Sequence, residues 1–218
     1  MERMLSENNP RFLTIDNLKL RVRTSPDLGV NPSKPVVVLF HGASFSLDDW
    51  DKIGTLSELS NRAIPYLAVD LPKGKSSKSQ KREERELSAY IPLLQELFNK
   101  SGIDLEQSKL IIVGPSMGGG FALAYAMART EQVMGLVLIA PSLAGVNREL
   151  LEKLEIPVLL IWGDKDTIFP VEERGKELKA ILPKSKLLIV KGARHPVYLD
   201  RPSEFHDLLF DFIEEISS

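Results

Sequence analysis

The sequence predicts an α/β fold in which helices flank a mainly parallel central sheet. Short apolar runs rich in β-branched residues recur along the chain, as in strands that are covered on both faces. Helix-like stretches separate most of these runs, and this alternation implies right-handed β–α–β crossovers. The chain has 218 residues, a length that fits one domain. We expect that domain to span residues 12–218, after a flexible tail at residues 1–11.

An antiparallel hairpin is expected first, because apolar and polar residues alternate in Phe12–Ile15 and Leu18–Val22. The other strands are expected at the continuous apolar runs, which are Val36–Phe40, Pro65–Val69, Leu110–Val113, Met134–Ile139, Val158–Trp162 and Lys186–Val190. Helices are expected over Asp49–Asn61, Glu83–Lys100, Met117–Arg129, Val171–Leu182 and Pro202–Ile216.

The composition argues against several classes of function. A formal net charge of −2 does not suit a nucleic-acid binder that works by bulk charge. The absence of cysteine removes disulfides, thiol nucleophiles and thiolate metal sites, and we expect neither a metal nor a cofactor. No apolar run approaches the ~18 residues that span a bilayer. The first residues carry charges and Pro10 in place of an apolar signal core, so we expect a cytoplasmic protein without a membrane partner.

The candidate nucleophile is Ser116. Sites in open α/β sheets lie at the carboxyl ends of the strands, and Leu110–Val113 runs directly into GPSMGGG and then into a helix-like stretch. This is a G-x-S-x-G pattern in its strand–turn–helix context, where a sharp turn exposes the serine. The alternative is a glycine-rich turn with a helix-capping serine. A phosphate-binding loop is disfavoured, because no Lys-Ser/Thr pair follows the glycines.

A serine hydroxyl needs a base, and histidine suits that role near neutral pH. Among three histidines, His195 follows the last expected strand. We assign His41 an orienting role and His206 a surface or packing role. A carboxylate that orients the base is expected after Val158–Trp162, where Asp164 and Asp166 compete; we choose Asp166. The resulting chain order, Ser116, Asp166, His195, is the Ser…Asp…His order of one hydrolase class.

Acyl transfer also needs donors for a developing oxyanion. The expected donors are the backbone N–H groups of Met117 and Ala43, and the Ser44 hydroxyl could assist. We assign substrate contacts to Ser44, Phe45 and Pro141, which follow strand ends.

Five stretches together resemble the α/β-hydrolase superfamily over nearly the whole chain. They are HGASFSLDDW, AVDLPKGKSS, GPSMGG, IWGDKDTIFP and GARHPVYLDRPSEFHDLLFDFI. Within it, the chain is similar to the small capless hydrolases of the domain-fourteen branch. The resemblance implies ester hydrolysis on small activated acyl esters, or acetyl transfer involving protein lysine and coenzyme A, and it matches the family's catalytic aspartate to Asp166. Lys73 and Lys75 depart from it, because they stand where the superfamily usually has glycines.

The stretch from Ala140 to Pro157 has room for one short helix and no cap, so we expect an open site that suits activated esters or acyl groups on a larger partner. Basic residues in Lys73–Arg85 could attract an anionic substrate, although a solvated loop is favoured. The leading hypothesis is a carboxylesterase or thioesterase that acts through an acyl-enzyme. The alternatives are an acyltransferase, a cofactor-free haloperoxidase or perhydrolase, and a partner-binding module without catalysis.

Overall fold

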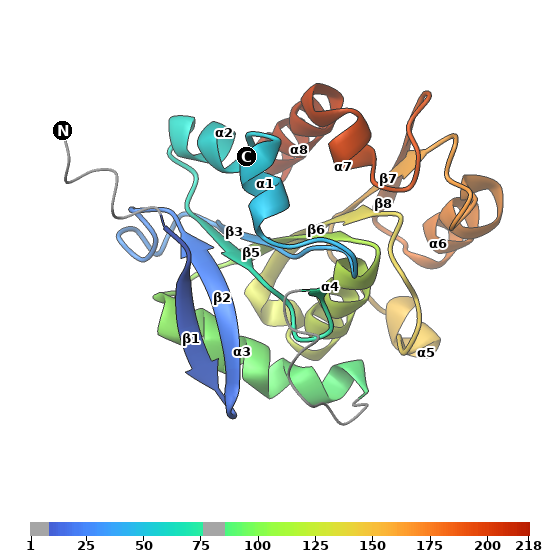
Figure 1. Ribbon diagram of the computed structural model, residues 1–218. Helices are drawn as coiled ribbons and strands as arrows, with labels where there is room; N and C mark the ends of the chain where they lie inside the picture. The colour runs from blue at the N-terminus through green and yellow to red at the C-terminus, as the bar shows by residue number, and fades with distance from the viewer. Residues whose placement is uncertain (1–8, 76–85) are drawn as a thin grey trace.

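An eight-stranded sheet forms the centre of the molecule in a computed structural model that describes residues 9–75 and 86–218 (Figure 1). The strand order is β1-β2-β4-β3-β5-β6-β7-β8. The first two strands, β1 (Arg11–Ile15) and β2 (Leu18–Thr24), form the expected antiparallel hairpin at one edge. The others are parallel to one another: β3 (Val36–Leu39), β4 (Tyr66–Val69), β5 (Leu110–Pro115), β6 (Val133–Ile139), β7 (Val158–Gly163) and β8 (Ser185–Val190).

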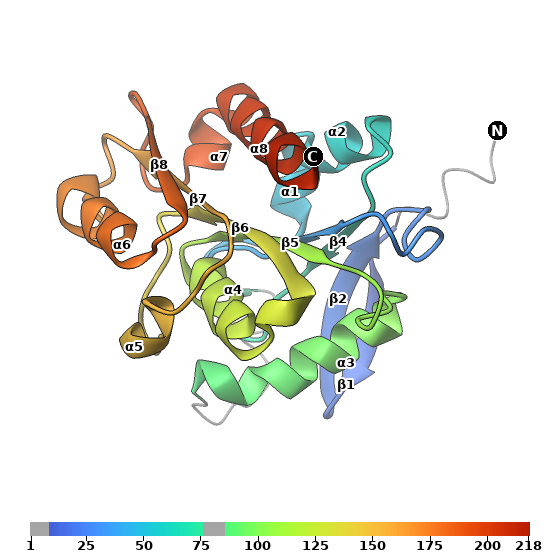
Figure 2. The same ribbon diagram turned by 180° about the vertical axis from the view of Figure 1, so that it is seen from behind.

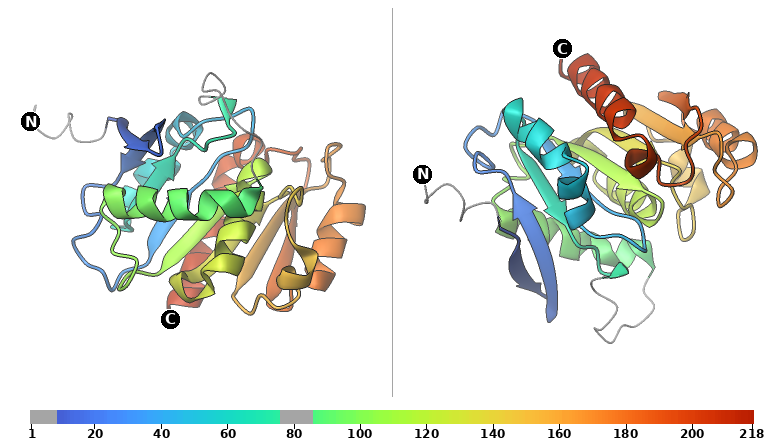
Figure 3. Two further views of the ribbon diagram at one scale, coloured as in Figure 1. Left: turned by 90° about the horizontal axis from the view of Figure 1, so that it is seen from below. Right: turned by 45° about the horizontal axis from the view of Figure 1, so that its top comes forward.

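Helices cover both faces of this sheet. Figures 1 and 2 show α1, α2, α7 and α8 on one face and α3, α4 and α5 on the other, and Figure 3 shows the two layers from below and with the top tilted forward. Their bounds are α1 Asp48–Lys52, α2 Thr55–Asn61, α3 Ile91–Ser101, α4 Met117–Ala128, α5 Arg148–Leu151, α6 Lys176–Ile181, α7 Val197–Asp200 and α8 Pro202–Ser217. Among the described residues, no helix is both long enough and apolar enough to cross a bilayer.

The two helical layers explain why the strands are apolar throughout. In β3, Val36 and Val38 pack into the core beneath α3 and α4, whereas Val37 and Leu39 pack beneath α1 and α8. A strand with one covered face would alternate with polar residues, but here both sets of side chains are buried. Each such buried aliphatic side chain contributes about 1.5–3 kcal/mol to the stability of the fold.

Three of the expected helices differ from the structure. The helix expected over Asp49–Asn61 is two helices, because the chain turns at Gly54, whose φ of 82° lies in the left-handed region. The helix expected over Val171–Leu182 begins as a π-helical turn, Val171–Gly175, before α6. The helix expected from Glu83 is described only from residue 86, where a 3-10 turn, Leu87–Tyr90, precedes α3.

The topology also fixes where a site can form. From β3 the chain crosses to β4 on one side and later to β5 on the other side. The loops that leave β3 and β5 therefore separate and open a crevice at the carboxyl edge of the sheet, the edge formed by the C-terminal ends of the parallel strands. The loops after β3, β5, β6, β7 and β8 carry the candidate residues named above.

Candidate active site

Ser116 occupies a strained turn between β5 and α4. Its φ is 49° and its ψ is −116°, a region that non-glycine residues adopt only when surrounding structure holds them there. The Ser116 N–H donates to the Ile139 carbonyl at 2.9 Å. Its own carbonyl accepts from the N–H groups of Gly119, at 3.0 Å, and Ser142, at 2.8 Å. The turn is therefore fixed to α4 and to the chain that leaves β6.

The glycine after Met117 is needed because the turn passes very close to the loop after β3. A Cβ atom at Gly118 would lie 2.8 Å from the His41 carbonyl oxygen and 2.9 Å from the Phe40 Cβ. Any larger residue would push the serine turn away from that loop. The G-x-S-x-G pattern thus has a packing reason in this chain.

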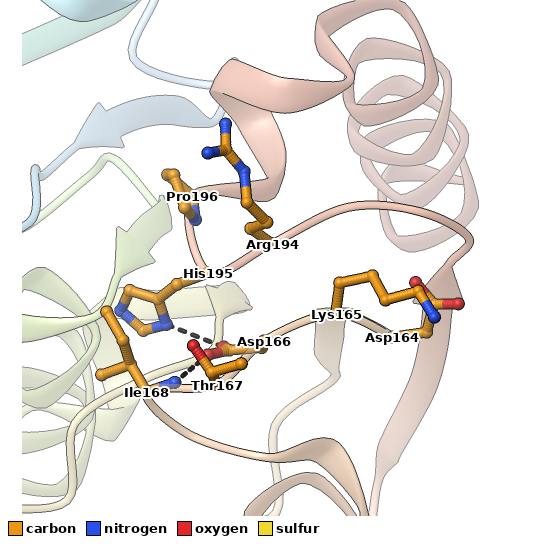
Figure 4. A pocket seen from close by; sticks show the side chains of 8 residues that line it. All are labelled: Asp164, Lys165, Asp166, Thr167, Ile168, Arg194, His195 and Pro196. Carbon is orange, nitrogen blue, oxygen red and sulfur yellow. Dashed lines mark hydrogen bonds and ion pairs between the residues drawn. The ribbon is translucent and has the colours of Figure 1, made fainter.

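The imidazole of His195 is paired with Asp166. Its Nδ1 lies 2.7 Å from Asp166 Oδ2 (Figure 4). The other carboxylate oxygen, Oδ1, accepts from the N–H groups of Ile168, at 2.8 Å, and Phe169, at 2.9 Å. Asp166 is buried and fully bonded, so it can hold the imidazole with Nδ1 protonated and Nε2 free to accept a proton.

The second aspartate of this turn points elsewhere. Asp164 Oδ1 accepts from the Gly192 N–H at 2.6 Å, and Figure 4 shows the Asp164 side chain turned away from His195. The two aspartates that compete in the sequence are therefore separated by geometry, and it is Asp166 that contacts the histidine.

The loop that carries His195 rests directly on the end of β7. The Lys165 N–H donates to the Ala193 carbonyl at 2.9 Å. A Cβ atom at Gly163 would lie 2.2 Å from the Ala193 carbonyl oxygen and 2.5 Å from that of Arg194. Glycine at this position lets the histidine loop pack directly against the end of β7. This contact positions His195 at the carboxyl edge of the sheet.

The side chains of Ser116 and His195 share the carboxyl edge of the sheet but are not bonded to each other. Within residues 9–75 and 86–218, no hydrogen bond joins the Ser116 hydroxyl to the imidazole. Catalytic hydrogen bonds are often long in a free enzyme and tighten when substrate binds. The structure thus brings Asp166 and His195 into contact and leaves Ser116 on a neighbouring loop.

The loop after β3 passes beside the serine. A Cβ atom at Gly42 would lie 3.7 Å from the Ser116 Cβ. The next residue, Ala43, is exposed, and its N–H makes no hydrogen bond within the described parts of the chain. Met117 is the first residue of α4, where an N–H has no partner inside the helix. Both expected oxyanion donors are therefore available.

His41 fixes the loop that carries Ala43. Its Nε2 accepts from the Leu71 N–H at 2.9 Å, and its Nδ1 lies 2.8 Å from the Gly42 carbonyl, to which it donates. Both bonds require the neutral imidazole with Nδ1 protonated. Burial lowers the pKa of His41 and outweighs the attraction of the nearby Asp70 carboxylate. These contacts fit the orienting role that the sequence suggests.

The stability of the protein is expected to fall in mild acid because of two histidines. Burial lowers the pKa of His41 and of His206, which is half-buried and bonded to Thr55 Oγ1 at 2.9 Å. In the unfolded chain both titrate near pH ~6.5, so protons bind the unfolded state first and favour it. The contribution of both groups to stability is present above about pH 6.5 and is lost as the pH falls below it.

Urea unfolding at pH values of about 7.5 and 5.5 measures this loss, since ordinary carboxylates titrate below that range. His206→Gln keeps a polar partner for Thr55 and removes one of the two titrating groups, so the difference between the two pH values should shrink. Equal free energies of unfolding at both pH values in the wild type would contradict the expectation.

The residues assigned to substrate contact lie against two different cavities. Pro141 lines a cavity of about 360 Å³ that also contacts Phe169. Ser44 and Phe45 line a separate one of about 610 Å³, together with Lys75. The rest of the basic stretch, residues 76–85, lies outside the described residues.

Two features of the site were not expected from the sequence. The Phe169 ring packs edge-on against His195, with ring centroids 5.2 Å apart. Arg21 of β2 donates to Asp70 at 3.0 Å, and Asp70 accepts from the Leu47 N–H at 2.8 Å. Asp70 therefore links the loop after β3 to the N-terminal hairpin. The sequence separation in these pairs matches no known motif, so the contacts could not be predicted, although Asp70 directly follows a strand.

Comparison with known proteins identifies the family. A family profile described as alpha/beta hydrolase fold matches residues 35–152, which include Ser116. The rat protein named putative protein-lysine deacylase ABHD14B is 33% identical over 186 residues, which cover 83% of this chain and 84% of the relative. This chain belongs to the α/β-hydrolase superfamily.

Two further relatives support the same assignment for this α/β hydrolase. The zebrafish protein ABHD14A is 30% identical and matches 83% of this chain and 64% of its own length. The crystal structure of a predicted CIB-like hydrolase from Thermoplasma acidophilum superposes on this fold with a TM-score of 0.81 and 26% sequence identity. The match covers 95% of this chain and 98% of the chain in that structure. The expected similarity to the domain-fourteen branch is confirmed.

This α/β hydrolase has a short connection between β6 and β7. Residues 140–157 contain α5 as their one helix, so no helical cap covers the carboxyl edge from this connection, as expected. Among the described residues, no group of three or more His, Asp or Glu side chains is arranged to hold a metal ion.

Proposed function

We propose that this α/β hydrolase is a serine hydrolase that cleaves carboxylic esters or thioesters through an acyl-enzyme. The observation that carries the proposal is the 2.7 Å contact between His195 Nδ1 and Asp166 Oδ2. A buried carboxylate on Nδ1 leaves Nε2 as the basic nitrogen, which is the arrangement that activates a serine. The strained turn at Ser116 and the exposed loop at Ala43 supply the other parts that acyl transfer needs.

In the proposed reaction, Ser116 Oγ attacks the acyl carbonyl while His195 Nε2 takes its proton. The oxyanion accepts hydrogen bonds from the N–H groups of Met117 and Ala43. His195 then protonates the leaving alcohol or thiol, and Asp166 stabilises the imidazolium throughout. A water molecule, deprotonated by His195, releases the acid and restores the serine.

The substrate is proposed to be a small ester or thioester, or an acyl group carried by a larger partner. The short connection between β6 and β7 leaves the carboxyl edge accessible, and a relative at 33% identity is named a putative protein-lysine deacylase. The chain requires no cofactor for this chemistry, because every proton transfer in it uses His195.

Labelling with a fluorophosphonate followed by peptide mass spectrometry tests the proposal. A single adduct on Ser116 is expected in the wild type and none in Ser116→Ala. Ser57→Ala is the control, because Ser57 is an exposed serine on α2 that does not line the candidate site or the cavity beside it. It should label like the wild type. Folded wild-type protein that forms no adduct, or forms it at another serine, would reject Ser116 as the nucleophile.

A further inference from the structure

A cavity of about 360 Å³ shares walls with the candidate active site. One wall is Phe169, whose ring packs against His195. Another is formed by Pro141 and Ser142, and the Ser142 N–H donates to the Ser116 carbonyl at 2.8 Å. The cavity therefore lies next to the turn that carries Ser116, and its volume is in the range of small-ligand pockets.

Apolar side chains form much of the cavity wall. Trp162 and Leu178 are buried at its base, and Leu143, Val146 and Phe169 complete its walls. The one polar group of the tryptophan, Nε1, donates to the Phe169 carbonyl at 2.7 Å. It is not available to a ligand. Such walls suit a hydrocarbon chain.

Two guanidinium groups stand at the rim of the same cavity. Arg148 comes from α5 and Arg174 from the π-helical turn before α6. Both are more than half exposed and both face one carboxylate, Glu177: Arg148 is ion-paired with it, whereas Arg174 lies 3.9 Å away. No carboxylate is among the described residues that line the cavity. The rim therefore has an excess of positive charge.

We propose that this cavity binds the acyl part of the substrate and selects acyl chains that end in a carboxylate. The methylene segment would lie against the apolar walls, and the terminal carboxylate would be paired with Arg148 and Arg174, whose planar guanidinium groups suit carboxylate geometry. This inference rests on the proposed function and names the substrate class of the same site. A neutral acyl chain of similar size is the competing occupant.

The test compares two p-nitrophenyl esters. One carries an adipoyl group, and the other carries its neutral isostere, in which an isopropyl group replaces the terminal carboxylate. Rates measured with Ser116→Ala are subtracted as background. The wild type should have the higher kcat/KM for the adipoyl ester, and that preference should decrease as the salt concentration rises, because the charges are exposed.

In the double variant Arg148→Gln/Arg174→Gln, the ratio of kcat/KM between the two esters should fall by about tenfold, since each exposed ion pair contributes a few-fold. Arg62→Gln is the matched control: Arg62 is also a half-exposed arginine paired with one glutamate, Glu58, but it lies at the C-terminal end of α2. Its ratio should equal that of the wild type.

Three results would overturn the inference. A wild-type preference for the neutral ester would identify a neutral acyl chain as the occupant. An unchanged ratio in the double variant would remove the arginines from substrate selection. Failure of the wild type to hydrolyse either ester above the Ser116→Ala background would reject the proposed function itself. This outcome differs from a failure of acyl selection alone, in which the neutral ester would still be hydrolysed.

Discussion

Asp166→Asn is expected to lower kcat for ester hydrolysis by about 10⁴-fold, the magnitude found for the equivalent change in a serine protease triad. The amide cannot stabilise the imidazolium that forms on His195, and it allows the wrong tautomer. The fold should persist, because the amide oxygen can still accept from the Ile168 and Phe169 N–H groups that now bond Oδ1. Steady-state kinetics on a p-nitrophenyl ester, with thermal unfolding as a check of folding, measures the effect.

Asp164→Asn is the matched control two residues earlier in the same turn. Asp164 bonds the Gly192 N–H and does not contact the histidine, so kcat should stay within a few-fold of the wild type. Near-normal turnover in Asp166→Asn would remove that residue from the mechanism. A large loss in Asp164→Asn alone would transfer the role of the acid to Asp164.

Gly163→Ala is expected to reduce kcat by about 10²-fold, although residue 163 bears no reacting group. Its Cβ would lie 2.2 Å from the Ala193 carbonyl oxygen and 2.6 Å from the Ala193 carbonyl carbon. These are backbone atoms, so the histidine loop must move. A displacement of about 1 Å at a catalytic group can cost about 10²-fold, and overpacking of this kind lowers the free energy of unfolding by about 1–3 kcal/mol.

Gly54→Ala separates the local effect from general destabilisation. No atom lies within 4 Å of a Cβ added at Gly54, but its φ of +82° strains any other residue. This variant should lose about 1–3 kcal/mol of stability and keep the wild-type kcat. If Gly163→Ala has the kcat and stability of the wild type, the contact between β7 and the histidine loop does not position His195.

The sheet could be predicted from the sequence because both of its faces are buried. Continuous apolar runs such as Leu110–Val113 mark the strands, and the structure extends or trims them by one or two residues at the ends. The helix expected over Asp49–Asn61 was wrong at Gly54, where a left-handed turn separates α1 from α2. Its apolar spacing continues across the break, so periodicity alone does not reveal the turn.

The sequence predicts only those residues of the candidate site that directly follow a strand. Ser116, Asp166 and His195 each follow a strand, and the topology brings strand ends to one edge. Phe169 and Arg148 belong to segments whose positions depend on tertiary packing, and no local pattern marks them. The pairing of Asp70 with Arg21 joins residues 49 positions apart, and nothing in the sequence near either residue indicates it.

The backbone strain at the carboxyl edge has a consequence for the stability of the fold. Ser116 and Ala140, which directly follow the neighbouring strands β5 and β6, have φ values of 49° and 40°. Such conformations cost about 1–3 kcal/mol each, against a total stability of about 5–15 kcal/mol for a typical domain. Glycine would fit the turn at 116 without strain. The proposed nucleophile is therefore held at position 116 at a cost in stability, which Ser116→Gly would relieve.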